Sequence, residues 1–351
     1  MPMFRARNYE IDTLQPIVDQ FPKFTPHRLL PGGHLQTITA AVFQGRRFPH
    51  QAKLHPVVLD DGDTTILHDD QPTNWSPTSP VAILVHGLAG CGRSSYMTRA
   101  AGLLNEAGVR TFRLDFRACG VGENRSRLPY HGGCSGDLLQ AMQRVVELCP
   151  SAPMNLIAYS IGGNVALKLL GESNRQLPAN LDRAVIVSPP IDVAKCVDRL
   201  TAAPTRYYDR YLVKLLYKQL RRSPRLVDHA PHIIDAPRPL TQRAFDELYT
   251  APVWGFESAD ALYNATSSLP FINDIRVPTL LLSSRDDPLV PVEMFEQLKP
   301  PAALSVHLTD SGGHLGFIGR GGSDPDRRWM DWRVVDAVTA NRAVSRRSAA
   351  A

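Results

Sequence analysis

Short apolar runs bounded by turn residues recur along the chain, and their lengths are those of buried strands. The clearest runs are Val81–Val85, Val109–Asp115, Met154–Tyr159, Ala184–Val187, Thr279–Leu282 and Leu304–Leu308. Between several of them apolar residues recur every three or four positions, as in residues 137–149, which is typical of amphipathic helices. Strands that alternate with such helices predict an α/β fold with a mostly parallel, twisted sheet and helices on both of its faces.

Two segments depart from this alternation. Lys53–Asp60 and Thr64–Leu67 flank an Asp-Gly-Asp turn, which predicts an antiparallel hairpin at the edge of the sheet. Residues 189–269 contain no clear run of the buried-strand type, but Tyr207–Leu220 and Gln242–Tyr249 have helical patterns. A helical insertion between two core strands predicts a cap or lid over the strand ends.

The chain is expected to form one folded unit, because its 351 residues suffice for one large core. We expect residues 49–188 and 270–342 to form that core and residues 189–269 to form the lid. Residues 1–48 are interpreted as an N-terminal arm that packs on the core, and residues 343–351 as a flexible tail.

Composition and charge argue against several classes of protein. The net charge of +5 comes from 39 basic and 34 acidic residues spread along the chain, which is too diffuse to predict nucleic-acid binding. No run of roughly 18 apolar residues is present and the opening residues lack a signal-peptide core, so we expect a cytoplasmic protein with no transmembrane anchor. Transient contact with a membrane surface stays open. The five cysteines form no C-x-x-C pair, and neither a metal nor an organic cofactor is predicted.

The sharpest local signal is Ala158-Tyr159-Ser160-Ile161-Gly162, which lies between a predicted strand and a predicted helix. A serine on such a turn is held in a strained conformation. The residues two positions before and after it must be small, because strand and helix nearly touch there. Ala158 and Gly162 meet this requirement, so Ser160 is predicted to be a nucleophile. The alternative is a serine that only caps the helix.

A nucleophilic serine needs a base, and the base needs a group that orients it. His314 lies in a glycine-rich loop after the last predicted strand, and Asp287 follows the strand before it, in the chain order serine, acid, histidine. The carboxyl ends of parallel strands share one rim of the sheet, so both residues are expected near Ser160. Asp286 is the alternative orienting acid, although the sequence Asp287-Pro-Leu-Val-Pro favours Asp287.

Two backbone N–H groups are expected to stabilise the oxyanion that develops on a substrate. The N–H of Ile161 lies at the start of the helix after Ser160, and the N–H of Leu88 follows the strand that ends at Val85. His86, in the same loop as Leu88, is interpreted as a structural hydrogen-bonding residue and not as a second base.

The loop from Gly87 to Ser94 also spells G-x-x-x-x-G-R-S, which is one residue away from a nucleotide-binding P-loop. Asp115, at the end of another strand, would then help to hold magnesium. Arg93 stands where a P-loop has lysine, however, and nucleotide binding leaves Ser160 and its partners unexplained. Nucleotide binding is therefore the weaker hypothesis, as is a catalytically inactive binding module.

The chain resembles the YheT-like α/β-hydrolases, a family that includes bacterial esterases and mammalian membrane-associated lipid hydrolases. The segments that carry the resemblance are Pro31–Thr37, His86–Tyr96, Asp115–Gly120, the Ser160 turn, Arg243–Asp246, Trp254–Phe256 and the acid and histidine loops. The chain departs from the family at Ala158, where glycine is usual, and at Gly32-Gly33, which replaces an Asn-Pro step. The resemblance implies the α/β-hydrolase fold and cleavage of carboxylic esters, with short- to medium-chain acyl esters or lipid-like esters as substrates.

We therefore expect a serine hydrolase that cleaves small-molecule acyl esters through a Ser-His-Asp triad and an acyl-enzyme intermediate. An acyltransferase with the same triad is the alternative, because only the acceptor of the acyl group differs. The segment His34-Leu35-Gln36-Thr37 is interpreted as part of the arm packed on the core, with a contact to substrate as the alternative. The sequence leaves the acyl-chain length and the oligomeric state open.

Overall fold

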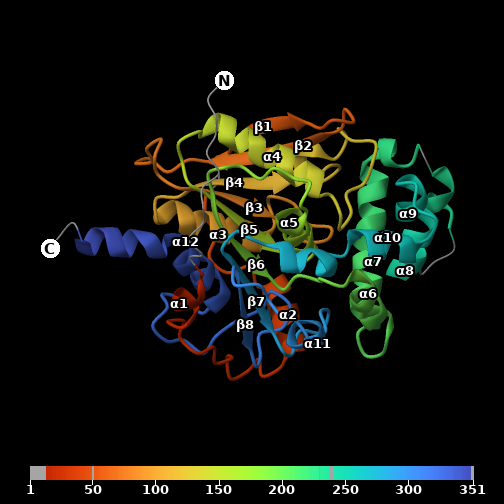
Figure 1. The fold of residues 1–351 in the computed structure, drawn as a ribbon. Helices are drawn as coiled ribbons and strands as arrows, with labels where there is room; N and C mark the ends of the chain where they lie inside the picture. The colour runs from red at the N-terminus through yellow and green to blue at the C-terminus, as the bar shows by residue number, and fades with distance from the viewer. Residues whose placement is uncertain (1–12, 50, 229, 237–240, 349–351) are drawn as a thin grey trace.

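The computed structural model describes residues 13–49, 51–228, 230–236 and 241–348, and it contains an eight-stranded sheet (Figure 1). The strands are β1 Lys53–Val58, β2 Thr64–Asp70, β3 Val81–Val85, β4 Arg110–Asp115, β5 Met154–Tyr159, β6 Leu181–Val187, β7 Thr279–Ser284 and β8 Leu304–Thr309. Their order is β1-β2-β4-β3-β5-β6-β7-β8, and neighbours from β4 to β8 are parallel. β1 and β2 pair antiparallel at one edge, which confirms the predicted hairpin.

Helices connect the strands and cover the sheet. They are α1 Gln15–Val18, α2 Gly33–Val42, α3 Ser95–Glu106, α4 Ser135–Leu148, α5 Ile161–Gly171, α6 Val193–Thr201, α7 Arg206–Arg222, α8 Gln242–Phe245, α9 Ala251–Val253, α10 Ala259–Thr266, α11 Glu293–Glu296 and α12 Trp329–Ser348. The alternation of side chains along a strand divides the core between two faces. In β3, Ile83 packs with α4 and α5, whereas Ala82 and Leu84 pack with α3 and α12. The predicted fold class, a mostly parallel sheet with helices on both faces, is confirmed.

The segment between β6 and β7 is helical in its described residues. Figure 1 shows α6 to α10 gathered on one side of the sheet, away from α1 and α12. The predicted helix at Tyr207–Leu220 corresponds to α7, but the one predicted at Gln242–Tyr249 is divided into α8 and a π-helical turn, Asp246–Thr250. In this stretch the side chains of Gln242 and Thr250 both donate hydrogen bonds to the Asp246 carboxyl group between them.

The two ends of the chain contain more regular structure than the sequence patterns indicated. The segment expected to be an arm contains α1 and α2, and its first twelve residues lie outside the described part of the chain. At the other end, α12 continues to Ser348, so a helix extends into the segment expected to be a tail. The last three residues of that tail lie outside the described residues.

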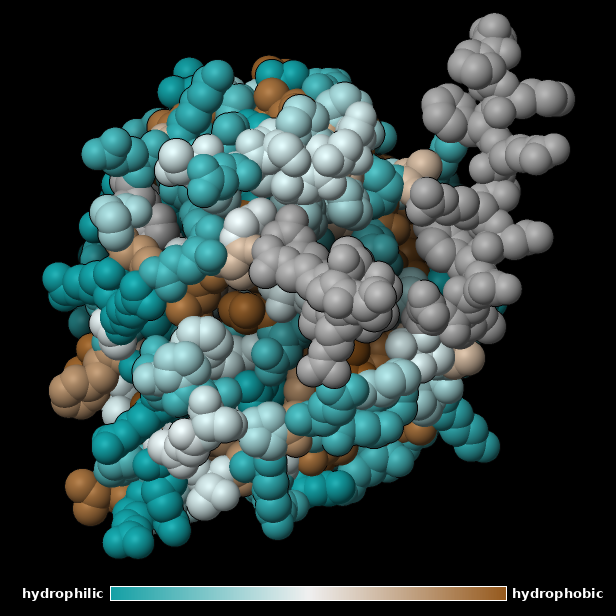
Figure 2. Space-filling view, turned by 90° about the vertical axis from the view of Figure 1, so that its left-hand side faces the viewer, coloured by the Kyte–Doolittle hydropathy of each residue, from teal (hydrophilic) through white to brown (hydrophobic). Residues whose placement is uncertain are grey.

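The surface on the side of α1 and α12 is mainly hydrophilic. Figure 2 shows that, outside the grey atoms, hydrophobic side chains on this side form small patches separated by polar ones. Across residues 13–49, 51–228, 230–236 and 241–348, none of the helices combines the length and the apolar character needed to cross a lipid bilayer.

Candidate active site

Ser160 occupies the sharp turn between β5 and α5. Its backbone has φ 53° and ψ −128°, a region that non-glycine residues rarely adopt and that stores strain. A Cβ atom on Gly162 would lie 2.4 Å from the carbonyl oxygen of His86, so only glycine fits at that position. Ala158 is fully buried on the other side of the turn. The chain therefore packs strand, turn and helix closely enough to expose the Ser160 hydroxyl at the end of the sheet.

The side chains of Ser160, His314 and Asp287 form a continuous chain of hydrogen bonds. The Ser160 Oγ lies 2.9 Å from the His314 Nε2, and the His314 Nδ1 lies 2.8 Å from the Asp287 Oδ2. An ionised carboxylate only accepts hydrogen bonds, so His314 Nδ1 donates to Asp287 and Nε2 is free to accept the serine proton. The other oxygen of Asp287 accepts the N–H groups of Leu289 and Val290. This network orients the imidazole toward Ser160.

Asp286, the alternative acid, has a different position. Its Oδ1 accepts hydrogen bonds from the Gly313 N–H, at 2.8 Å, and from the Ser284 hydroxyl, at 3.0 Å. It therefore holds the backbone of the loop that carries His314, while Asp287 contacts the imidazole itself. Both aspartates therefore position His314, Asp286 through the backbone of its loop and Asp287 through its ring.

His86 is fully buried beneath the loop after β3. Its Nε2 accepts the N–H of Phe116, so its Nδ1 carries the proton and donates to the carbonyl of Gly87 at 2.8 Å. Burial lowers the pKa of His86 below its usual value, which keeps the ring neutral. The structure thus gives His86 a hydrogen-bonding role within the loop.

Two tyrosine hydroxyl groups fix the backbone around the N–H group of Leu88. On either side of Leu88, the N–H of Gly87 donates to the Tyr96 hydroxyl and that of Ala89 donates to the Tyr130 hydroxyl. Among the hydrogen bonds of the described residues, the N–H groups of Leu88 and Ile161 take no part. Both residues line the same pocket as Ser160.

The segment Gly87–Ser94, which resembles a P-loop, is fixed by a hydrogen bond to a buried aspartate. Asp115 is fully buried and accepts hydrogen bonds from the N–H groups of Gly92, at 2.5 Å, and Val121, at 3.0 Å. The His68 Nε2 lies 2.8 Å from the same carboxyl group. An aspartate enclosed in this way is not available to a magnesium ion. Within the described part of the chain, no group of three or more His, Cys, Asp or Glu side chains is arranged to hold a metal.

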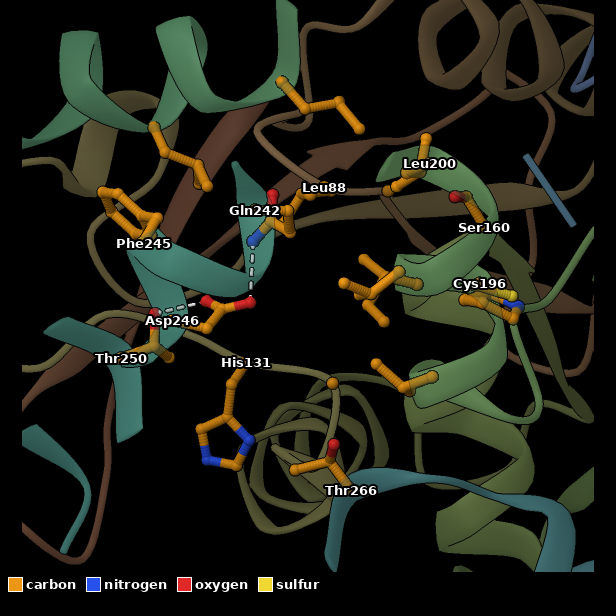
Figure 3. A pocket seen from close by; sticks show the side chains of 18 of the residues that line it. Leu88, His131, Ser160, Cys196, Leu200, Gln242, Phe245, Asp246, Thr250 and Thr266 are labelled. Carbon is orange, nitrogen blue, oxygen red and sulfur yellow. Dashed lines mark hydrogen bonds between the residues drawn. The ribbon is translucent and has the colours of Figure 1, made fainter. Parts of the chain in front are cut away.

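A pocket of about 260 Å³ opens beside Ser160 and extends under the helices between β6 and β7. Figure 3 shows Ser160, Cys196 and Leu200 on one side and Phe245 and Asp246 on the other. Its walls are mainly apolar, with contributions from Val193, Val197, Leu200, Leu212, Leu216, Leu220, Phe245 and Leu262. Such a lining favours an apolar ligand or an apolar part of one.

Burial shifts the pKa values of two polar groups in the pocket wall toward their neutral forms. The Asp246 carboxyl group accepts hydrogen bonds from Gln242 and Thr250, drawn in Figure 3, and from the Tyr263 hydroxyl. Burial raises its pKa above the usual value. His131 packs edge-on against Trp254, and burial lowers its pKa to about 3. Neither group therefore favours a charged form as strongly as it would in water.

The segment His34-Leu35-Gln36-Thr37, left open by the sequence, holds the histidine loop in place. The Thr37 hydroxyl accepts the backbone N–H of His314 at 2.8 Å and donates to the Gly33 carbonyl. The Gln36 side chain is fully buried and bonds to both the N–H and the carbonyl of Ile318. In the structure this segment packs on the histidine loop, and the sequence interpretation did not identify Gln36 and Thr37 as positioning residues.

Gly33 explains one departure from the family pattern. A Cβ atom at this position would lie 1.8 Å from the carbonyl oxygen of Asp286, so any side chain would push α2 away from the loop that precedes Asp287. The glycine lets the two backbones touch.

Comparison with known proteins identifies the fold family and relatives of the chain. A family model described as the alpha/beta hydrolase fold matches residues 80–320. The chain is 31% identical to the putative esterase YheT of Escherichia coli, over 90% of this chain and 93% of that protein. It is 28% identical to a monoacylglycerol lipase of Saccharomyces cerevisiae, over 74% of this chain and 59% of that protein. The esterase Pf2001 of Pyrococcus furiosus, at 19% identity, has a similar fold, with a TM-score of 0.54 over 84% of this chain and 94% of that one.

Proposed function

We propose, from the premise that the chain belongs to the α/β hydrolase fold family and is a YheT-like member of it, that it cleaves carboxylic esters with Ser160 as nucleophile. Ester cleavage is the chemistry named for its esterase and lipase relatives. The observation that carries the assignment of residues is the hydrogen-bond chain from Ser160 through His314 to Asp287. It supplies a base within 2.9 Å of the hydroxyl and an acid that fixes the tautomer of that base.

In the first half of the proposed reaction, the Ser160 Oγ attacks the ester carbonyl carbon while its proton passes to the Nε2 of His314. Asp287 stabilises the resulting imidazolium through Nδ1. The negative charge that develops on the carbonyl oxygen is accepted by the N–H groups of Leu88 and Ile161. His314 then returns the proton to the leaving alkoxide, so the alcohol departs and the acyl group remains bound to Ser160.

In the second half, water replaces the alcohol. His314 Nε2 takes a proton from the water as its oxygen attacks the acyl carbon, and the same two N–H groups hold the second oxyanion. Collapse of this intermediate breaks the bond to Ser160, whose Oγ recovers the proton from His314, and releases the carboxylic acid. The chemistry requires no metal or organic cofactor.

The substrates we propose are short- to medium-chain acyl esters or lipid-like esters. The apolar lining contributed by α6 and α7 suits an acyl chain, because burial of each methylene contributes about 0.8 kcal/mol. The low pKa of His131 and the three hydrogen bonds that the Asp246 carboxyl group accepts keep the cost of contact with an apolar ligand low. We further propose that residues 189–269, which contribute most of this wall, act as a lid that selects the ester.

The test is hydrolysis of p-nitrophenyl butyrate, together with labelling by a fluorophosphonate that reacts with activated serines. We expect Ser160→Ala to lose several orders of magnitude in turnover and all labelling. Ser188→Ala is the matched control, because Ser188 also has a positive φ, of 49°, but forms no hydrogen bond to a histidine among the described residues. Full activity in Ser160→Ala would disprove the proposal. Added ethanol that diverts product to ethyl butyrate would indicate acyl transfer in place of hydrolysis.

A further inference from the structure

Helix α2 has its polar contacts inside and its apolar side chains outside. Gln36 is fully buried, whereas Leu35, Ile38 and Val42 have exposed fractions of 47%, 43% and 65%. The spacing of these three residues places them on one face of the helix. Phe43 follows directly, with 67% of its surface exposed. Water covers an apolar helix face that a folded protein normally buries.

Helix α7 adds a basic stripe and two tyrosines to its outer face. Arg206, Arg210, Lys214 and Lys218 are exposed and recur every four residues, so they lie along one side of the helix. Tyr207 and Tyr211, with exposed fractions of 44% and 57%, lie beside them. The one acidic residue of α7, Asp209, is buried. The outer side of α7 is therefore positively charged.

The two helices meet at His34. The His34 Nδ1 lies 2.7 Å from the Tyr207 hydroxyl and 3.2 Å from the Tyr208 hydroxyl, and its ring stacks on Tyr208. Ile38 is one helical turn from His34, so the apolar face of α2 adjoins the tyrosines of α7. We call the combined surface the docking face, and its members are Leu35, Ile38, Val42, Phe43, Arg206, Tyr207, Arg210, Tyr211 and Lys214.

The docking face borders the entrance to the pocket. On its α2 side, Thr37 holds the backbone of His314, and on its α7 side Leu212 and Leu216 line the pocket. Elsewhere on the described surface, the large apolar side chains of comparable exposure are Leu29, which lies near the start of α2, Leu248, and Leu54 and Val58, which share one face of β1 without a basic stripe beside them like that of α7. The opposite side of the molecule is mainly hydrophilic (Figure 2). A concentration of apolar surface at one place indicates a binding partner.

We propose that the docking face binds an anionic lipid surface and so brings the pocket entrance to that surface. Aliphatic side chains of α2 would enter the boundary between headgroups and acyl chains, where tyrosine rings are also stable. Arg206, Arg210 and Lys214 match the negative charge of anionic headgroups, which attract each nearby basic residue. Charge complementarity distinguishes this partner from a second copy of the chain, whose docking face would repel the first.

Binding to lipid is independent of the proposed esterase function, whereas delivery of lipid esters to Ser160 rests on it. The first measurement is flotation of the full chain with vesicles of phosphatidylcholine alone or of equal parts phosphatidylcholine and phosphatidylglycerol. We expect binding to the anionic vesicles, weakened by salt, and at least about tenfold weaker binding to the neutral ones. Ser160→Ala should bind as the unmodified chain does, which separates this result from the fate of the esterase proposal.

Two variants identify the surface. The first is a triple variant that removes the apolar face of α2: Leu35→Gln, Ile38→Gln and Val42→Gln. The second is a double variant that reverses the charge of α7: Arg210→Glu and Lys214→Glu. Each is expected to weaken binding to anionic vesicles at least about tenfold. The matched control is Leu54→Gln with Val58→Gln, which removes side chains of 45% and 70% exposure from β1 and should leave binding unchanged. Hydrolysis of soluble p-nitrophenyl butyrate should be the same in all of them.

Three results would overturn the proposal. The first is absence of binding to either kind of vesicle, and the second is equal binding by the unmodified chain and both docking-face variants. The third is a dimer of the unmodified chain, seen by sedimentation velocity, that does not bind lipid and that dissociates when the α2 substitutions are made. This result would assign the docking face to a second copy of the chain. The result that we expect is a monomer in solution that binds anionic vesicles through α2 and α7.

Discussion

The rim that carries Ser160, Asp287 and His314 and the insertion of residues 189–269 are built by different means. On the rim, backbone contacts fix each position, as the strained φ of Ser160 and the close approach of Gly33 to Asp286 illustrate. In the insertion, helices are held by packing of apolar side chains such as Val213, Tyr217 and Phe245. Backbone contacts tolerate almost no change, whereas apolar packing tolerates substitutions of similar volume.

This difference assigns separate tasks to the two regions. A rim whose side chains are positioned by close backbone contacts suits the transfer of a proton and the formation of a bond. A wall of interchangeable apolar side chains suits selection among esters by size. Substitutions on the rim should therefore change the rate for every ester alike, and substitutions in the insertion should change the preference among esters.

The largest effect beyond loss of Ser160 itself is expected for Asp287→Asn. An amide does not stabilise the imidazolium and favours the wrong tautomer of His314, so kcat should fall roughly a thousandfold or more for short and long esters alike. Asp286→Asn keeps an oxygen that can accept the Gly313 N–H and should lose less than about tenfold. Steady-state kinetics of both variants measure the difference, and an equal loss in the two would remove the distinction drawn between the aspartates.

A pH-dependent effect is expected where the rim meets the insertion, at His131. The pKa of this histidine is about 3 in the folded protein and 6.5 in the unfolded chain, so only the unfolded chain binds the proton between these values. Stability contributed by the neutral ring is present above the unfolded pKa and is lost as the pH falls. From neutral pH to about pH 5 the loss is about 2 kcal/mol of unfolding free energy.

Urea unfolding of His131→Asn tests this expectation, because asparagine offers an oxygen to the Gly133 N–H but does not take up a proton. The change in unfolding free energy between neutral and acidic pH should be about 2 kcal/mol smaller in the variant than in the unmodified chain. His86, whose pKa is also lowered by burial, is present in both proteins and cancels. Identical pH profiles would show that His131 is charged or accessible in the folded state.

A smaller effect is expected for Thr37→Val. Valine has nearly the same shape but leaves the backbone N–H of His314 without its acceptor, so the histidine loop should shift and kcat should fall about tenfold while KM is unchanged. Thr37→Ser restores the hydroxyl and should restore kcat. If Thr37→Val acted only by lowering the stability of the fold, Thr37→Ser would not specifically restore kcat. The two variants together therefore distinguish positioning of His314 from packing of α2.

The smallest effect is expected in the insertion, for Leu200→Ala. Leu200 lines the pocket from α6, and its truncation lengthens the space available to an acyl chain. The ratio of kcat/KM for an octanoyl ester over a butyryl ester should rise a few-fold, while the rate of fluorophosphonate labelling stays the same. A uniform loss for both esters would mean that the insertion also positions the rim.

The sequence predicts the sheet well because each buried strand is a short apolar run with turn residues at its ends. Ser160, Asp287 and His314 are predictable for a related reason, since each follows a strand and so reaches the same rim. Gln36 and Thr37 were not assigned a role, because their partners Ile318 and His314 lie far away in the sequence and no local pattern indicates such a contact. The π-helical turn at Asp246 was missed because the apolar periodicity of a short helical segment does not distinguish a π-helical turn from an α-helical one.

The hydrogen bonds between Gln36 and Ile318 join residues 282 positions apart. This separation determines when the site can form during synthesis of the chain. During synthesis, the segment with Gln36 and Thr37 leaves the ribosome before any strand of the sheet. The histidine loop emerges only after all eight strands. A growing chain therefore lacks a complete site until residues 314–318 are free, when α2 and the histidine loop come together.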